Sequence, residues 1–319
     1  MVTEIPALAP TFVPHRRRGT ALILVSSLCF GSSGTIAKPA MLAGLSAEQV
    51  AAARVGLAAL VLAAGVALVK PSLLRVRRAE WPLLLGYGLL GVAGVQLCYF
   101  VAAGRLPVGI AILLEFTSPV LIALWTRFVR GVRLPGRMWA GIALAMAGLA
   151  GVAQVWQGLS LDAVGLLAGL GAALCSAAYF LLGEHGVSTR SPIGMVTWGM
   201  VIGAVAVCAV APPWTMPGDV LTASAAIGPW HAPVWLLLVA VAVWSTVLAY
   251  AIGLSALRHL PAAVASVIGL LEAVVATATA WALLHETLDW PQLAGAVVLL
   301  GGALIVQLNS PRPQVPDAP

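Results

Sequence analysis

The chain has 319 residues, of which 61% are hydrophobic and only 9% are charged. Soluble globular domains carry about 25% charged residues, so this composition excludes an ordinary soluble protein and indicates one whose solvent is lipid. The net charge of +6 falls mainly in short loops between apolar segments, and it therefore gives no reason to expect a nucleic-acid partner.

Apolar segments of about 20 residues, the length that crosses the hydrocarbon core of a bilayer, recur along nearly the whole chain. We predict an all-α integral membrane protein with ten transmembrane helices. The predicted spans, numbered one to ten, are 19–38, 47–69, 81–103, 107–129, 135–155, 162–183, 193–212, 233–254, 261–284 and 290–309.

The two ends of the chain flank these spans. Span one follows His15 and three arginines, as the apolar part of a secretory signal peptide would. Its apolar run is as long as a full crossing and no small-residue cleavage site follows, so we predict a retained anchor. The Pro-rich ends, residues 1–18 and 310–319, are predicted to be disordered.

Basic residues predict the orientation, because Lys and Arg in short loops stay on the cytoplasmic side. With both termini in the cytoplasm, fourteen of the seventeen basic residues lie inside, and the chain is then a multi-pass protein of the plasma (inner) membrane. These residues are Arg16, Arg17, Arg18, Lys70, Arg75, Arg77, Arg78, Arg127, Arg130, Arg133, Arg137, Arg190, Arg258 and Arg312.

The sequence contains an internal repeat. The stretch from Leu106 to Gly141 is echoed by the stretch from Leu260 to Gly295, at a constant offset of 154 residues. We predict two five-helix halves, 19–155 and 162–309, joined by residues 156–161. Because five crossings is an odd number, the second half is inverted relative to the first, which is an architecture of secondary transporters.

Three further features of the sequence, together with the two five-helix halves, resemble a known family. They are Arg54 in span two, the stretch from Tyr99 to Pro119, and the Gly-rich spans five and ten. Over residues 19–309 the chain resembles EamA-type members of the drug/metabolite transporter superfamily. The resemblance implies movement of amino acids, sugars, nucleobases or drugs, mostly by export, through alternating access around a central cavity. Ala273 stands where the family often has the proline that distorts span nine, whereas Pro119 keeps that residue in span four.

Three acidic or basic residues lie deep inside predicted spans, near mid-bilayer, where a charge costs about 2.5 to 3.5 kcal/mol on insertion scales. Arg54 and Glu115 lie at matching depths, so they either pair and pin spans two and four together, or leave Glu115 to bind a substrate ammonium or a proton. Glu272 has no basic residue at a comparable depth in spans six to ten. It is either a neutral acid bonded to a nearby carbonyl or a carrier of protons.

Aromatic and amide side chains within the spans are candidates for the lining of a substrate cavity, because aromatic faces bind flat or cationic solutes and polar groups orient them. The alternative for each is ordinary helix packing. The candidates are Gln96, Tyr99, Tyr179, Trp198, Trp244 and Tyr250.

Other motifs give no sign of cofactor or metal chemistry. The letters GxGxxG at residues 86–91 lie inside an apolar span rather than between a strand and a helix. Both lysines, Lys38 and Lys70, precede proline, so no ATP-binding Gly-Lys-Ser/Thr loop exists. The histidines are scattered and the four cysteines lack ligand spacing, so we predict no metal and no cofactor.

We therefore predict a secondary transporter, rather than an enzyme, of small organic solutes such as amino-acid-like metabolites or drugs. Export is preferred, import uses the same architecture, and protons are the candidate coupling ion. A polytopic enzyme acting on lipids is the main alternative, yet it needs a cluster of catalytic groups that the sequence lacks. A non-transporting sensor or scaffold is a second alternative. GxxxG pairs leave a monomer and a homodimer both open.

Overall fold

The computed structural model describes residues 15–156, 162–284 and 289–309. Of the ends predicted to be disordered, residues 1–14 and 310–319 fall outside these ranges, as does nearly all of the predicted linker; residues 16–18, also predicted to be disordered, are helical and begin α1. All ten predicted spans are helical, with ends displaced by a few residues; helix α1, for example, begins at Arg16 instead of residue 19.

The first half contains spans one to five. Their helices, with two short 3-10 segments and one π-helical segment, are α1 (Arg16–Gly31), α2 (Ser33–Leu42), α3 (Ala47–Val69), η1 (Pro71–Leu74), η2 (Arg78–Glu80), α4 (Trp81–Gly86), η3 (Tyr87–Gly94), α5 (Val95–Ala103), α6 (Val108–Glu115), α7 (Ser118–Phe128) and α8 (Gly136–Val152).

The second half contains spans six to ten and the longest connection. Its elements are α9 (Ala163–Thr189), α10 (Pro192–Val210), η4 (Pro213–Thr215), α11 (Gly218–Thr222), β1 (Ser224–Ile227), β2 (Trp230–Pro233), α12 (Val234–Ala242), η5 (Val243–Leu248), α13 (Ala249–Ala256), α14 (Ala262–Gly269), α15 (Leu271–Leu284) and α16 (Trp290–Asn309).

Nine helical segments in the described ranges are long and apolar enough to cross a membrane. The exception is span five, α8, which has 17 residues and so lies at the lower limit of a crossing length. The structure thus confirms a multi-span helical membrane protein, while the count of ten and the inverted arrangement stay predictions.

Contacts between loops collect the basic residues at one end of the helix bundle. Arg190 bonds to Glu80 and to the carbonyl of Arg75, Arg258 bonds to the carbonyl of Arg190, and Arg130 pairs with Glu184. We call this the basic end. The charge pattern predicts that it faces the cytoplasm.

Spans four and nine are both interrupted near their middle. In span four the break follows α6 at Phe116 and Thr117, just before Pro119. Span nine breaks at Leu270 although Ala273 supplies no proline. The amide of Ala273 donates to the carbonyl of Leu270 at 3.0 Å, a tighter i to i+3 turn that interrupts the helical pattern. The distortion that family resemblance implies is therefore present without its usual residue.

Spans three and eight each contain a π-helical segment, η3 and η5. The two segments lie at corresponding places in the two halves. Such segments are rare and often mark functional sites in membrane and soluble proteins. These π-helical segments could not be predicted from hydrophobic periodicity, because they are as apolar as the helices on either side.

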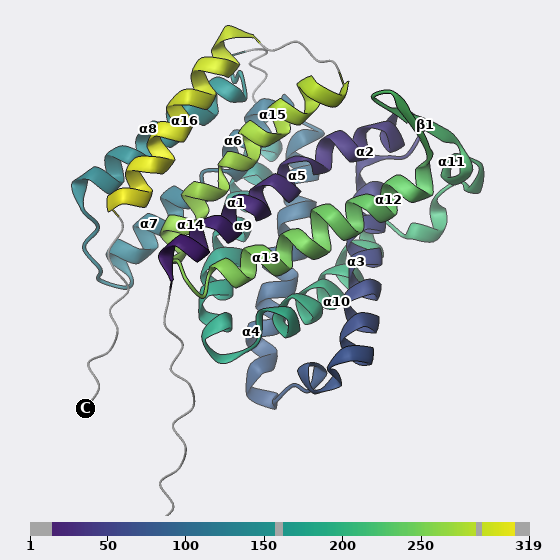
Figure 1. Ribbon diagram of the computed structural model, residues 1–319, viewed down its shortest axis with the longest axis horizontal. Coiled ribbons are helices and arrows are strands. Elements are labelled where there is room, and N and C mark those ends of the chain that lie inside the picture. Colours follow the sequence, from purple (N-terminus) through teal and green to yellow (C-terminus); the bar gives the residue numbers. More distant parts are fainter. Residues whose placement is uncertain (1–14, 157–161, 285–288, 310–319) are drawn as a thin grey trace, which may run out of the picture.

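Helices α8 and α16 run side by side at one edge of the bundle (Figure 1) and touch almost backbone to backbone. A Cβ atom added to Gly302 would lie 2.7 Å from the carbonyl oxygen of Gly141, and one added to Gly148 would lie 2.7 Å from that of Gly295. The GxxxG pairs are also used within the chain: Gly199 packs on Tyr87 and Gly169 on Leu114. Close helix contact between the halves is the reason for the glycines.

Gly302→Ala is expected to lower the thermal unfolding midpoint of the purified protein by several degrees, because the new methyl group meets backbone atoms that cannot move aside. Gly301→Ala is the matched control, since its nearest neighbour would be Leu144 Cδ2 at 3.9 Å. Thermal unfolding in detergent measures both. Equal midpoints for the two variants would contradict the packing argument.

The connection between spans seven and eight is folded, which the sequence did not predict. Strands β1 and β2 form an antiparallel hairpin in which Ser224 pairs with Pro233 and Ile227 with Trp230. The side chain of Ala225 joins an apolar cluster with Leu45 of the first half and Val234 of α12. The predicted all-α class therefore holds for the spans, and the hairpin covers the helix ends opposite the basic end.

Candidate functional site

Three charged side chains from both halves meet in the middle of the spans. The Glu115 carboxyl interacts electrostatically with Glu272 and with Arg54, and the Glu272 carboxyl interacts with Arg54. Each of the three side chains is half-buried. Spans two, four and nine thus bring one guanidinium and two carboxyls together; we call these three residues the charge cluster.

The two carboxyls of the charge cluster lie at opposite kinds of helix end. Glu115 precedes the break in span four, and Glu272 follows the break in span nine. Glu115 is the last residue of α6, whereas Glu272 is the second residue of α15. A helix carries partial negative charge at its carboxyl end and partial positive charge at its amino end. The same chemical group therefore has two different electrostatic surroundings, and the two glutamates are not equivalent.

Arg54 does not form a direct strut with either glutamate. In residues 15–156, 162–284 and 289–309, no ion pair within 4.0 Å involves Arg54, and its buried Nε atom has no hydrogen-bond partner. Its interactions with the two carboxyls are longer-range. The arrangement therefore leaves donors on Arg54 that a third group can occupy, and buried donors strongly favour having a partner.

Four of the predicted polar candidates surround the charge cluster. Tyr99 interacts electrostatically with both glutamates and with Arg54. Tyr250 interacts with the same three groups, and the Gln96 side chain lies next to its hydroxyl. Tyr179 interacts with Glu272 and Tyr250. Hydroxyl and amide groups therefore lie around the charges, as recognition of a small polar solute requires.

Aromatic rings continue from this group across both halves. Tyr179 contacts Tyr250 with ring centroids 5.5 Å apart and Tyr87 with centroids 5.6 Å apart, and Phe30 contacts Tyr250 at 5.0 Å. Sequence reasoning missed Tyr87 and Phe30. Tyr87 lies within the glycine-rich residues 86–91 of an apolar span, and Phe30 is a single aromatic residue in an apolar helix. Neither pattern distinguishes a residue near the charge cluster from one in ordinary helix packing.

Trp198 and Trp244 both donate hydrogen bonds from their indoles. The indole of Trp198 donates to the carbonyl of Leu74 at 3.2 Å and packs on Trp81 at the basic end. The indole of Trp244 donates to Ser32 Oγ in span one at 2.9 Å. Their part in lining a cavity stays a prediction.

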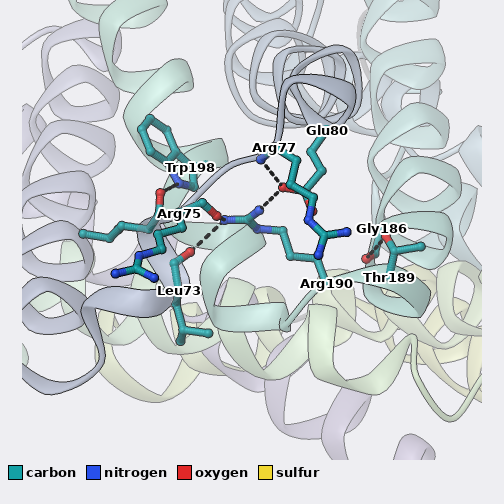
Figure 2. A network of polar contacts seen from close by, with 9 residues as sticks. Leu73, Arg75, Arg77, Glu80, Gly186, Thr189, Arg190 and Trp198 are labelled. Carbon is teal, nitrogen blue, oxygen red and sulfur yellow. Dashed lines mark hydrogen bonds and ion pairs between the residues drawn. The ribbon is translucent and has the colours of Figure 1, made fainter.

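A network centred on Arg190 joins the halves at the basic end (Figure 2). The Arg190 guanidinium lies 2.6 Å from Glu80 Oε2 and donates to the carbonyls of Leu73 at 2.7 Å and Arg75 at 3.1 Å. Its side chain is only 9% exposed. From the sequence, Arg190 contributes only to the predicted orientation, because no sequence pattern shows which loop a single arginine will bond to.

Glu184 forms a second connection at the basic end. Its carboxylate pairs with Arg130 of the first half and accepts a hydrogen bond from the amide of Ala262, at the start of α14, at 2.9 Å. At the opposite end, Arg105 and Asp162 lie 3.6 Å apart with side chains 50% and 42% exposed. Exposed pairs contribute little, so we expect the Arg105–Asp162 pair to matter less than the half-buried contacts of Arg190.

Arg190→Gln is expected to loosen the loop that includes Leu73 and Glu80, because the carboxylate and two carbonyls lose their donor at a cost of about 2 kcal/mol or more. Hydrogen exchange of residues 71–80 should become faster, and the thermal unfolding midpoint should fall by a few degrees. The control is Arg105→Gln, which breaks only the exposed pair. If both variants exchange as the parent does, Arg190 does not hold the halves together.

Over the described residues, no group of three or more His, Cys, Asp or Glu side chains could hold a metal ion. The guanidinium and two carboxyls of the charge cluster are suited to ion pairing, hydrogen bonding and proton binding. These are the interactions that recognise a small charged solute in a low-dielectric site.

The chain is similar to known proteins over nearly its whole length. The model of the EamA-like transporter family matches residues 17–154 and 163–308. The threonine/homoserine exporter RhtA of Salmonella typhimurium (strain LT2) is 29% identical over 296 residues, covering 92% of this chain and 93% of that protein. RhtA of Escherichia coli (strain K12) is 29% identical over 294 residues, covering 91% and 92%. A solved crystal structure superposes with a TM-score of 0.74 at 19% identity, covering 92% of this chain and 98% of that one.

Proposed function

Because the chain belongs to the EamA-like transporter family, we propose that it exports small amino-acid-like metabolites by alternating access, driven by a proton gradient or by exchange. The observation that carries the proposal is the charge cluster, in which both halves place ionisable groups at one point within the spans. The names of its relatives, threonine/homoserine exporters, support the same substrate class.

The charge cluster is complementary to a zwitterion. Arg54 offers donors to an α-carboxylate, because a guanidinium pairs with carboxylates in a planar, two-bond geometry. Glu115 and Glu272 offer acceptors to an α-ammonium. Tyr99, Tyr250 and Gln96 add groups that bond to polar atoms of the side chain. A sugar or nucleobase would leave the charges without partners, so it fits this site less well.

Protons and substrate compete for the same carboxyls in this proposal. With both glutamates ionised, the charge cluster carries one more negative than positive charge. A bound proton neutralises this excess, whereas a bound zwitterion pairs its ammonium with the carboxylates and its carboxylate with Arg54. A site that holds one or the other exchanges them across the membrane. The basic end faces the cytoplasm, so opening at that end admits the substrate.

Transport assays in proteoliposomes test the proposal. Purified protein is reconstituted, a pH gradient is imposed, and flux is measured for labelled threonine, homoserine, other amino acids, sugars, nucleobases and quaternary amines. We expect flux of small amino acids several-fold above that in protein-free vesicles, and its loss when a protonophore collapses the gradient. Flux of sugars or nucleobases alone would overturn the assignment of substrate class, and no flux of any solute would overturn transport.

A further inference from the structure

Span one passes directly over the backbone of Glu272. A Cβ atom added to Gly31 would lie 2.6 Å from the carbonyl oxygen of Glu272 and 2.7 Å from Cβ of Val275. Real Cβ atoms do not approach a backbone oxygen that closely, so only glycine allows this packing. The contact falls on the first turn of α15, the turn that carries the carboxyl of the charge cluster.

The direction of that first turn is not set by a proline. Span nine breaks at Leu270 directly after Gly269, a residue that permits a break but fixes no direction, and Ala273 is compatible with a continuous helix. Tertiary contacts therefore set the direction of the turn. Gly31 provides such a contact at the residue concerned.

Three polar contacts hold span one in its place around this point. Ser26 Oγ donates to the carbonyl of Ala249 at 2.8 Å, and Ser32 Oγ accepts from Trp244 at 2.9 Å. Further along, the hydroxyls of Thr35 and Thr279 lie 2.9 Å apart and tie α2 to α15. Ser32 also bonds to the carbonyls of Leu28 and Cys29, an arrangement that bends helices. Span one is therefore held by span eight at Ser26 and Ser32, on both sides of Gly31, and by α15 at Thr35.

We propose that Gly31 is a positioning residue for Glu272, whose backbone it holds at the distance that aims the carboxyl at Arg54 and Glu115. The inference rests on the proposed role of Glu272 in transport. It adds a residue without any polar group, on a span outside the charge cluster, to the determinants of how the site binds protons and substrate.

The experiment compares Gly31→Ala with Gly34→Ala. Both replace a helical glycine of span one and raise helix propensity by about the same amount, but a Cβ atom at Gly34 would meet nothing within 4 Å. We expect Gly31→Ala to cut gradient-driven flux per protein molecule about ten-fold or more, to change KM, and to shift the pH at which flux is half-maximal. Gly34→Ala should match the parent within two-fold, with an unchanged pH profile.

Two further variants keep the test decisive. Val275→Ala added to Gly31→Ala removes part of the clash and should restore some of the flux. If Gly31→Ala fails to insert, Thr279→Val removes the bond between span one and α15 without adding volume, and it should shift the pH at which flux is half-maximal. An unshifted profile and an unchanged KM in these variants would overturn the inference. Loss of transport in Glu272→Gln alone, with normal Gly31→Ala, would leave the proposed function standing and remove only the role of Gly31.

Discussion

Arg54→Gln should reduce amino-acid flux in proteoliposomes to below about 1% of that of the parent and also lower the amount of protein in the membrane. Two carboxyls would remain in the middle of the spans without a cation, and an uncompensated charge there costs about 2.5 to 3.5 kcal/mol on insertion scales. The substrate carboxylate would lose its donor as well. Flux normalised to reconstituted protein separates the two effects.

A second variant separates a structural role of Arg54 from substrate binding. Arg54→Gln combined with Glu115→Gln removes one positive and one negative group, so the formal charge of the charge cluster is that of the parent. We expect this double variant to insert normally and still to lack flux. If Arg54 and Glu115 only fixed spans two and four, a neutral Gln pair at these positions would keep transport. Normal flux in the double variant would therefore contradict the binding role.

Glu272→Gln should lower gradient-driven flux about 100-fold or more and abolish the pH dependence of the remaining flux. An amide has the shape of the carboxyl, but it neither takes up a proton over the pH range of the assay nor carries the negative charge that pairs with an ammonium. Exchange of labelled for unlabelled substrate should fall less, because exchange returns the site to its starting state without net proton movement. Flux and exchange are measured in the same vesicles over a range of pH.

Glu48→Gln is the control for Glu272→Gln, because Glu48 is an exposed acid at the end of span two, opposite the basic end. Its removal should leave both flux and exchange unchanged. A pH profile in Glu272→Gln identical to that of the parent would remove the proton-carrying role of Glu272. The site would then bind substrate alone.

The positions of the spans were predictable because lipid sets the length and polarity of a crossing helix. Arg54, Glu115 and Glu272 were predictable as candidates for a related reason, since ionisable groups within spans are rare. The interaction of Glu272 with Arg54 was not predictable, because the two residues belong to different halves of the chain. Contacts between halves depend on how the repeats dock, and no local pattern records this.

Backbone irregularities were the least predictable features. The break in span nine has no proline, the π-helical segments keep an apolar composition, and the hairpin between spans seven and eight resembles an ordinary Pro-rich connection in sequence. Their neighbours are distant in sequence: Gly31 lies against the carbonyl of Glu272, and Ala225 of the hairpin shares an apolar cluster with Leu45. The indoles of Trp198 and Trp244 likewise bond to partners that no local pattern identifies.

The glycine contact between α8 and α16 restricts how the two halves can move. These helices belong to different halves, yet almost no side-chain layer separates their backbones at Gly148 and Gly295. Sliding would drive Leu299 or Val152 into the opposing backbone, whereas rotation about the line of contact disturbs it least. If the charge cluster is exposed alternately, as proposed, we expect the pivot to lie along this helix pair and the helices away from it, such as α3 and α10, to move more.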